Sequence, residues 1–166
     1  IVLPLGEVKI KRKINSLNII FRSNTKVNIW DQNKARIFNK PKSEYTLRSL
    51  NSLLNSLQKA KTLLQNINLN LTIVDDNSDK TIIKKINLLL SRWKIVPNII
   101  NLNKNEFDDK IINEGNPETF GNLASLLKCF LIAKNEAEDL IFFVEDDYLH
   151  KDTLIEEMLM TYERLA

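Results

Sequence analysis

Apolar residues follow two patterns along the chain, and these patterns predict strands and helices in turn. Short apolar runs predict four strands, at residues 18–23, 69–74, 94–102 and 140–144. Apolar residues that recur at every third or fourth position predict four amphipathic helices, at residues 44–64, 81–90, 123–134 and 152–162. Each strand is thus followed by a helix, and this order predicts a Rossmann-like α/β fold with a mainly parallel sheet and helices on both faces.

Local features add detail to this prediction. Ser43 and Asp152 stand where they are suited to cap the first and last helices. The run Leu140–Val144 is the most apolar of the four, and such runs are typical of central parallel strands covered on both faces. Residues 24–43 are polar and predict a long loop, in which Arg36 is either a phosphate contact or a solvated side chain.

Length and composition restrict the class of protein. The 166 residues suit a single domain over residues 1–166 that forms its own hydrophobic core. One cysteine and one histidine, Cys129 and His150, exclude a disulfide scaffold, a cysteine-based zinc site and multi-histidine metal sites. No apolar run reaches the roughly 18–20 residues of a membrane helix. The net charge of +3 comes with no nucleic-acid-binding motif, so nucleic acid is not an expected partner.

Two acidic clusters directly follow predicted strands: Asp75-Asp76 follows the second, and Glu145-Asp146-Asp147 follows the fourth. Parallel strands place their carboxyl ends along one edge of the sheet, so we expect the clusters to share that edge. Two carboxylates about 4 Å apart repel by roughly 4 kcal/mol at an effective dielectric constant near 20, and a cation relieves this repulsion. Oxygen ligands without His or Cys favour Mg²⁺ or Mn²⁺. The alternative is that both clusters are solvated turns and helix caps.

Three segments resemble GT-A glycosyltransferases, in particular the large inverting family 2. Leu71–Asp79, which reads Leu-Thr-Ile-Val-Asp-Asp-Asn-Ser-Asp, is similar to the strand and acidic turn of that family. Phe142–Asp147, which reads Phe-Phe-Val-Glu-Asp-Asp, resembles the strand that leads into the family's Asp-x-Asp motif. Gly121–Ala124, which reads Gly-Asn-Leu-Ala, is similar to a small-residue and Asn segment that begins a helix before that strand. The resemblance spans about residues 18–160.

The resemblance implies a role for each acidic position. It assigns Asp76 to the nucleotide base, with Asp75 in the same nucleotide-binding turn. It assigns Asp147 to a divalent metal ion, Mn²⁺ or Mg²⁺, together with Glu145. It also implies that Asp146 faces the ribose or the sugar.

Two further residues complete the predicted site for the nucleotide sugar. Asn122 belongs to it by the same resemblance. Arg22 lies at the end of the first predicted strand, on the same edge of the sheet, where an arginine can bind phosphate through two hydrogen bonds. The strand ending Phe21–Asn24 departs from the Pro-Thr-Tyr-Asn type of the family.

The function that the resemblance implies is metal-dependent transfer of a sugar from a nucleotide-diphosphate donor to a glycan or lipid-linked acceptor. The general base is then expected beyond Ala166, in an acceptor-binding half, so that these residues form the donor half of a longer protein. The expected location is the cytoplasm, with peripheral membrane contact left open. One alternative is a non-catalytic nucleotide-binding or interaction domain of the same fold. Another is a nucleotidyltransferase, although such enzymes usually carry a Gly-rich basic loop that this sequence lacks.

Overall fold

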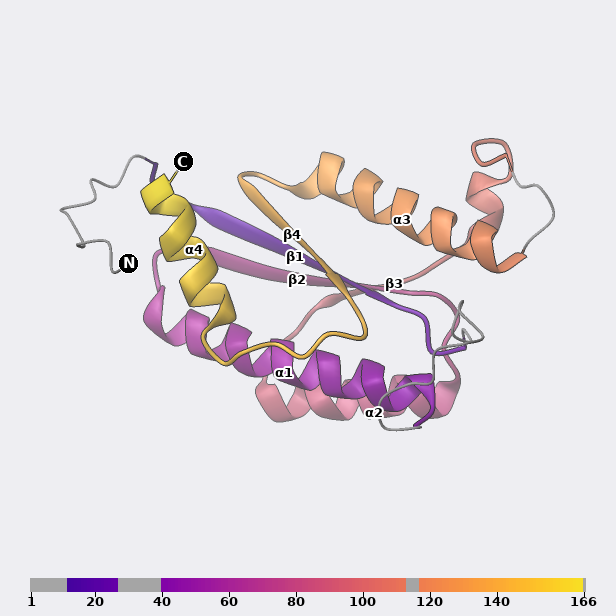
Figure 1. The fold of residues 1–166 in the computed structure, drawn as a ribbon, viewed down its shortest axis with the longest axis horizontal. Coiled ribbons are helices and arrows are strands. Elements are labelled where there is room, and N and C mark those ends of the chain that lie inside the picture. Colours follow the sequence, from indigo (N-terminus) through magenta and orange to yellow (C-terminus); the bar gives the residue numbers. More distant parts are fainter. Residues whose placement is uncertain (1–11, 27–39, 113–116, 166) are drawn as a thin grey trace, which may run out of the picture.

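The structure, a computed structural model, describes residues 12–26, 40–112 and 117–165. Within these residues the sheet contains four strands that all run parallel, in the order β3-β2-β1-β4 (Figure 1). The strands are β1 (Ser16–Ser23), β2 (Asn68–Asp75), β3 (Asn98–Asn101) and β4 (Leu140–Glu145). The predicted α/β fold with a parallel sheet is therefore confirmed.

Helices cover both faces of the sheet, as predicted (Figure 1). They are α1 (Lys42–Leu63), α2 (Lys80–Trp93), α3 (Pro117–Glu136) and α4 (Leu154–Leu165), with a short 3-10 helix η1 (Lys104–Phe107). On one face α1 packs between α2 and α4, whereas α3 packs on the other face against β1 and β2. The alternation of strands and helices in the sequence thus produces a three-layer domain.

The core is divided by the sheet because successive side chains of a strand point to opposite faces. In β1, Ile19 and Phe21 are fully buried with the helices α1, α2 and α4. Ile20 points the other way and packs with Cys129 and Ile132 of α3. Both layers are apolar and closely covered, so the central strand β1 holds the carboxyl edge of the sheet in a fixed position.

Four local predictions about the elements are wrong. The segment Gly121–Ala124 lies inside α3 and does not begin it, because that helix begins at Pro117. Ser43 lies inside the first turn of α1, because the helix begins at Lys42 after the extended residue Pro41. Asp152 precedes α4 by two residues, and its carboxylate instead binds the side chains of Asn55 and Lys59 on α1. The third strand is shorter than expected, since Lys94 is the C-cap of α2 and the strand begins only at Asn98, after Pro97.

The position of β4 also differs from the prediction. Among the described strands β4 pairs with β1 and lies at an edge of the sheet. Ile141 and Phe143 are 38% and 41% exposed, and Phe143 packs edge-on against the ring of Phe130 on α3. An apolar run reports that both faces of a strand are apolar, but it does not report whether both edges are paired. The predicted loop residue Arg36 lies outside the described residues.

In the described ranges, no helix is both long enough and apolar enough to cross a membrane.

Candidate functional site

The two acidic clusters lie at the carboxyl edge of the sheet, as predicted. Asp75 ends β2 and Glu145 ends β4, and the strand β1 lies between these two strands. The chain progresses from β1 through β2 to β3 in one direction, and β4 is then added on the other side of β1. In open α/β sheets ligands bind where the strand order reverses in this way. The carboxyl ends of β1 and β4 therefore mark the candidate site.

The acidic residues do not form one cluster, because neighbouring side chains point to opposite faces of the sheet. Asp75 and Asp146 point to the face covered by α1, where they bind different partners. Asp76 and Glu145 point to the face covered by α3. Among the described residues, no group of three His, Cys, Asp or Glu side chains is close enough to hold a metal ion.

Asp75 shapes the turn after β2. Its side chain is buried, and one carboxylate oxygen accepts hydrogen bonds from the hydroxyls of Ser23 and Ser78, both at 2.7 Å. The other oxygen accepts the backbone N–H of Ser78 at 2.8 Å. These three bonds leave the Asp75 carboxylate little capacity to bind a ligand. In the predicted nucleotide site Asp75 therefore holds the turn in shape and does not contact the ligand itself.

Asp76 forms an ion pair on the α3 face. Its carboxylate is 2.9 Å from Nζ of Lys104, in the segment that follows β3. The Asp76 side chain is only 2% exposed, whereas that of Lys104 is 35% exposed. Both lie against Gly121, where a Cβ atom would come within 2.7 Å of the Lys104 ammonium. A small residue in α3 thus leaves space for this ion pair.

Asp146 forms the most buried ion pair of the edge. Its carboxylate lies 2.7 Å from Nζ of Lys42, and the two side chains are 10% and 13% exposed. It also accepts hydrogen bonds from the hydroxyl of Thr46 at 2.8 Å and from the backbone N–H of Asn24 at 3.0 Å. Lys42 and Thr46 come from the first turns of α1, so Asp146 fastens the start of α1 to the end of β4.

Asp147 and Glu145, the predicted metal ligands, bind different cations. Asp147 is half-exposed and lies 3.4 Å from Nζ of Lys42. Glu145 is also half-exposed, and its carboxylate accepts a hydrogen bond from the guanidinium of Arg22 at 2.6 Å. The same guanidinium donates to the side-chain oxygen of Asn122 at 2.7 Å. Arg22, Asn122 and Glu145, which were predicted separately, are thus in direct contact.

Asn24 connects the two acidic turns. Its backbone N–H donates to Asp146, and its side-chain Nδ2 donates to Asp76 at 2.8 Å. Its position directly after β1 and between the two turns allows it to bind both. The sequence prediction missed this role, as it missed Lys42 and Lys104. The rule that strand ends share one edge would have indicated Asn24 and Lys104, since each follows a strand by one to three residues.

The carboxyl edge is therefore a set of opposite charges placed side by side. Three cationic side chains, Arg22, Lys42 and Lys104, each lie beside one or two carboxylates. Cations of this kind can also bind phosphate oxygens, with Arg best suited to a bidentate contact. The half-exposed carboxylates of Asp147 and Glu145 retain oxygens that face solvent. The edge thus offers donors and acceptors for a ligand that carries both phosphate and hydroxyl groups.

Among the described residues, the single cysteine and the single histidine form none of the ion pairs of this edge. Cys129 lies on the buried side of α3, and burial raises the pKa of its thiol to about 11, so it is a neutral core residue. His150 lies after β4 against α1, where its backbone N–H donates to the hydroxyl of Ser52 at 3.0 Å. Its Nε2 atom is buried and has no hydrogen-bond partner within the described part of the chain.

We expect His150 to make stability depend on pH. Partial burial holds the pKa of this imidazole below its usual value of 6.5, so the unfolded chain binds the proton first as pH falls. The free energy of unfolding should therefore decrease from about pH 7 downward and level off below the folded-state pKa. Urea unfolding at several pH values, compared between the wild type and His150→Gln, measures this effect. Parallel curves for the two proteins would contradict it.

Comparison with protein-family models, with curated proteins and with solved structures gave no match.

Proposed function

We propose that this domain binds the nucleotide-diphosphate sugar of a metal-dependent glycosyltransferase at the carboxyl edge of its sheet. The observation that carries the proposal is the joining of both acidic turns by Asn24 at the point where the strand order reverses. A ligand placed over the ends of β1 and β4 meets both turns at once. The segments that resemble GT-A enzymes therefore lie at one location in the fold.

The charges of the edge are suited to a donor of this class. The diphosphate is the most anionic part of a nucleotide sugar, and Arg22, Lys42 and Lys104 supply cations around the site. The hydroxyls of ribose and sugar require acceptors, and the solvent-facing carboxylate of Asp147 is one. Neutral pairing of acids with lysines also keeps the edge from repelling an anionic ligand.

A divalent ion, Mn²⁺ or Mg²⁺, is part of the proposal. In proteins Mg²⁺ is usually held by one or two carboxylates together with substrate phosphates, so a preformed group of three acids is not required. Asp147, whose side chain is 51% exposed, fits such a shared site, with Glu145 as the second carboxylate. When bound, the ion would neutralise charge on the diphosphate leaving group. This chain's own residues bind and orient the donor.

Calorimetric titration tests the proposal. The wild type is titrated with a panel of nucleoside diphosphates, once with Mn²⁺ and once with a chelator. We expect one base to bind best, binding to require the metal, and Asp147→Ala to weaken it at least about tenfold, because that change removes a metal ligand. Since Asp147 is half-exposed, this variant should remain folded.

The matched control is Glu138→Ala. Glu138 is exposed and precedes β4, so it lies at the opposite edge of the sheet, and its replacement causes the same change of charge. It should bind as the wild type does. If no diphosphate binds to the folded wild type, the proposal is wrong and the acidic turns are structural elements of an interaction domain. Tight binding of a nucleoside triphosphate alone would instead favour a nucleotidyltransferase.

A further inference from the structure

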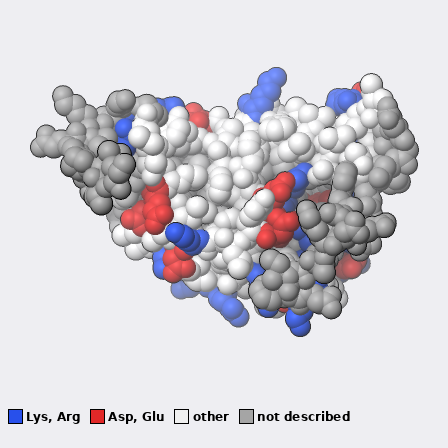
Figure 2. Space-filling view, in the orientation of Figure 1, with Lys and Arg blue, Asp and Glu red and all other residues white. Residues whose placement is uncertain are grey.

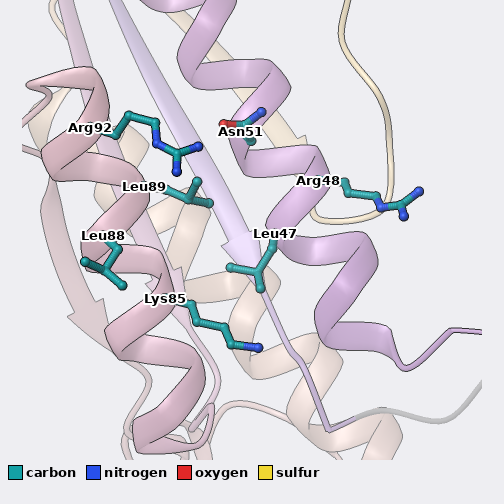
Figure 3. Close-up of a pocket in the computed structure, with 7 residues that line it drawn as sticks. All are labelled: Leu47, Arg48, Asn51, Lys85, Leu88, Leu89 and Arg92. Carbon is teal, nitrogen blue, oxygen red and sulfur yellow. The ribbon is translucent and has the colours of Figure 1, made fainter.

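A groove between α1 and α2 lies on the outer face of the helical layer. It has a volume of about 350 Å³. Its lining residues come from both helices and are Leu47, Arg48, Asn51, Lys85, Leu88, Leu89 and Arg92. In Figure 3, Leu47 and Leu89 lie in the space between the helices, and Arg92 extends from α2 toward α1. The groove therefore has an apolar floor and cations of α2 at its rim.

The helix α2 gives this face a concentrated positive charge. No Asp or Glu occurs from residue 80 to residue 105, although the whole chain has a net charge of only +3. Five exposed cations belong to α2 and its cap: Lys80, Lys84, Lys85, Arg92 and Lys94. Within the described ranges, no carboxylate forms an ion pair with Lys85 or Arg92. Figure 2 shows basic side chains projecting along the lower edge of the molecule, where α1 and α2 lie in Figure 1.

Apolar side chains stand exposed among these cations. Leu88 is 70% exposed in the middle of α2, and Val96 is 95% exposed in the segment that follows it. A leucine and a valine that project from a basic surface match the chemistry of a lipid headgroup layer, where cations bind phosphates and apolar side chains enter the acyl boundary.

We propose that the α1–α2 face docks on an anionic phospholipid membrane, with the groove receiving a lipid headgroup. Lys85 and Arg92 would bind headgroup phosphates at the rim, and Leu47 and Leu89 would contact the apolar part of the same lipid. Leu88 would enter the outer acyl region. This site is separate from the carboxyl edge, because α1 and α2 cover the sheet on one face and present the groove away from it. The inference does not depend on the proposed donor site.

The observations favour a membrane over an acidic protein partner. The cations are spread along α2 from Lys80 to Lys94, which suits a plane of mobile headgroups. Each Lys or Arg near an anionic leaflet adds to the attraction, so several together produce measurable binding. The exposed apolar residues supply the second contribution that stable attachment requires.

Vesicle co-sedimentation of the full chain tests the inference. Vesicles of phosphatidylcholine alone are compared with vesicles that also contain phosphatidylserine. We expect binding to the anionic vesicles at least about tenfold stronger, and loss of that binding at about 0.5 M salt. The double variant Lys85→Glu/Arg92→Glu should reduce binding at least about tenfold, and Leu88→Ser about threefold.

The matched control is the double variant Lys13→Glu/Lys134→Glu, which changes the charge equally on residues outside the α1–α2 face. It should bind within about threefold of the wild type, and circular dichroism shows that all variants are folded. An equal loss of vesicle binding in the control and in Lys85→Glu/Arg92→Glu would contradict the assignment of the binding site to the α1–α2 face. Equal binding to neutral and anionic vesicles, or no binding to either, would contradict the proposal that this face docks on an anionic membrane. Preferential binding of a poly-glutamate peptide over anionic vesicles would replace the membrane with an acidic protein partner.

Discussion

Replacing Asp146 with alanine is expected to lower the free energy of unfolding by about 3–4 kcal/mol. Removal of Asp146 takes away the close partner of a buried ammonium, because Lys42 is only 13% exposed and keeps only the longer 3.4 Å contact with Asp147. The change also leaves the hydroxyl of Thr46 and the backbone N–H of Asn24 without their acceptor. Urea unfolding followed by circular dichroism measures the loss.

The control for this prediction is Asp147→Ala. The two aspartates are adjacent, but Asp147 is half-exposed and, among the described residues, its carboxylate pairs with Lys42 at 3.4 Å. Its replacement should cost less than about 1 kcal/mol, as is typical of exposed pairs. In a double-mutant cycle of Lys42→Met and Asp146→Ala, the losses of unfolding free energy should be non-additive. The double variant should be more stable than the sum of the two single losses predicts. Equal losses for Asp146→Ala and Asp147→Ala would show that burial of the pair is unimportant.

Replacing Asp75 with alanine is expected to cost about 3 kcal/mol of unfolding free energy. The carboxylate accepts three hydrogen bonds, from the two hydroxyls of Ser23 and Ser78 and from one backbone N–H. Asp75 and Ser23 are almost fully buried, so the donors left behind cannot bind water freely. Asp75→Asn keeps one acceptor oxygen and should lose less unfolding free energy than Asp75→Ala. Thermal and urea unfolding of both variants measure the difference.

Asp79→Ala is the matched comparison, because Asp79 lies in the same turn and pairs with Lys26 at 3.1 Å while its side chain is 67% exposed. We expect this variant to lose less than about 1 kcal/mol. If Asp75→Ala lowered the free energy of unfolding as little as Asp79→Ala, the three hydrogen bonds of Asp75 would contribute no more than hydrogen bonds to water. The variants of Asp146 and Asp75 together distinguish structural carboxylates from the exposed Asp147, on which ligand binding is expected to depend.

The sequence predicted the element order well because each element carries its own local signal. The period of Leu50, Leu53, Leu54 and Leu57 predicts α1, and all four are fully buried. The apolar runs of β1, β2 and β4 were placed within two residues of their ends. Helix starts were less accurate: α3 begins at Pro117, six residues before the predicted start at Leu123, whereas α1 begins at Lys42, two residues before its predicted start.

The sequence predicted where the acidic residues lie, but it did not predict which cations pair with them. The sequence indicates that Asp76 and Asp146 share an edge, since both follow parallel strands. It does not indicate that they point to opposite faces, because this depends on the register of β1 with its two neighbours, where Arg22 is level with Val74 and Glu145. The lysines that pair with the acids were missed for the same reason. Lys104 and Lys42 are assigned to them by tertiary packing.

The pairing of β1 with β4 has a consequence for synthesis of the chain on the ribosome. Among the described strands β1 comes first in the chain, and because Leu17 is level with Leu140 it cannot pair with both of its neighbours until β4 has been made. At about 5–20 residues per second, the ribosome makes the intervening residues in on the order of ten seconds. During that interval the edge of β1 that later binds β4 has no native partner. A chaperone that holds nascent chains would therefore contact β1, the most buried of the described strands.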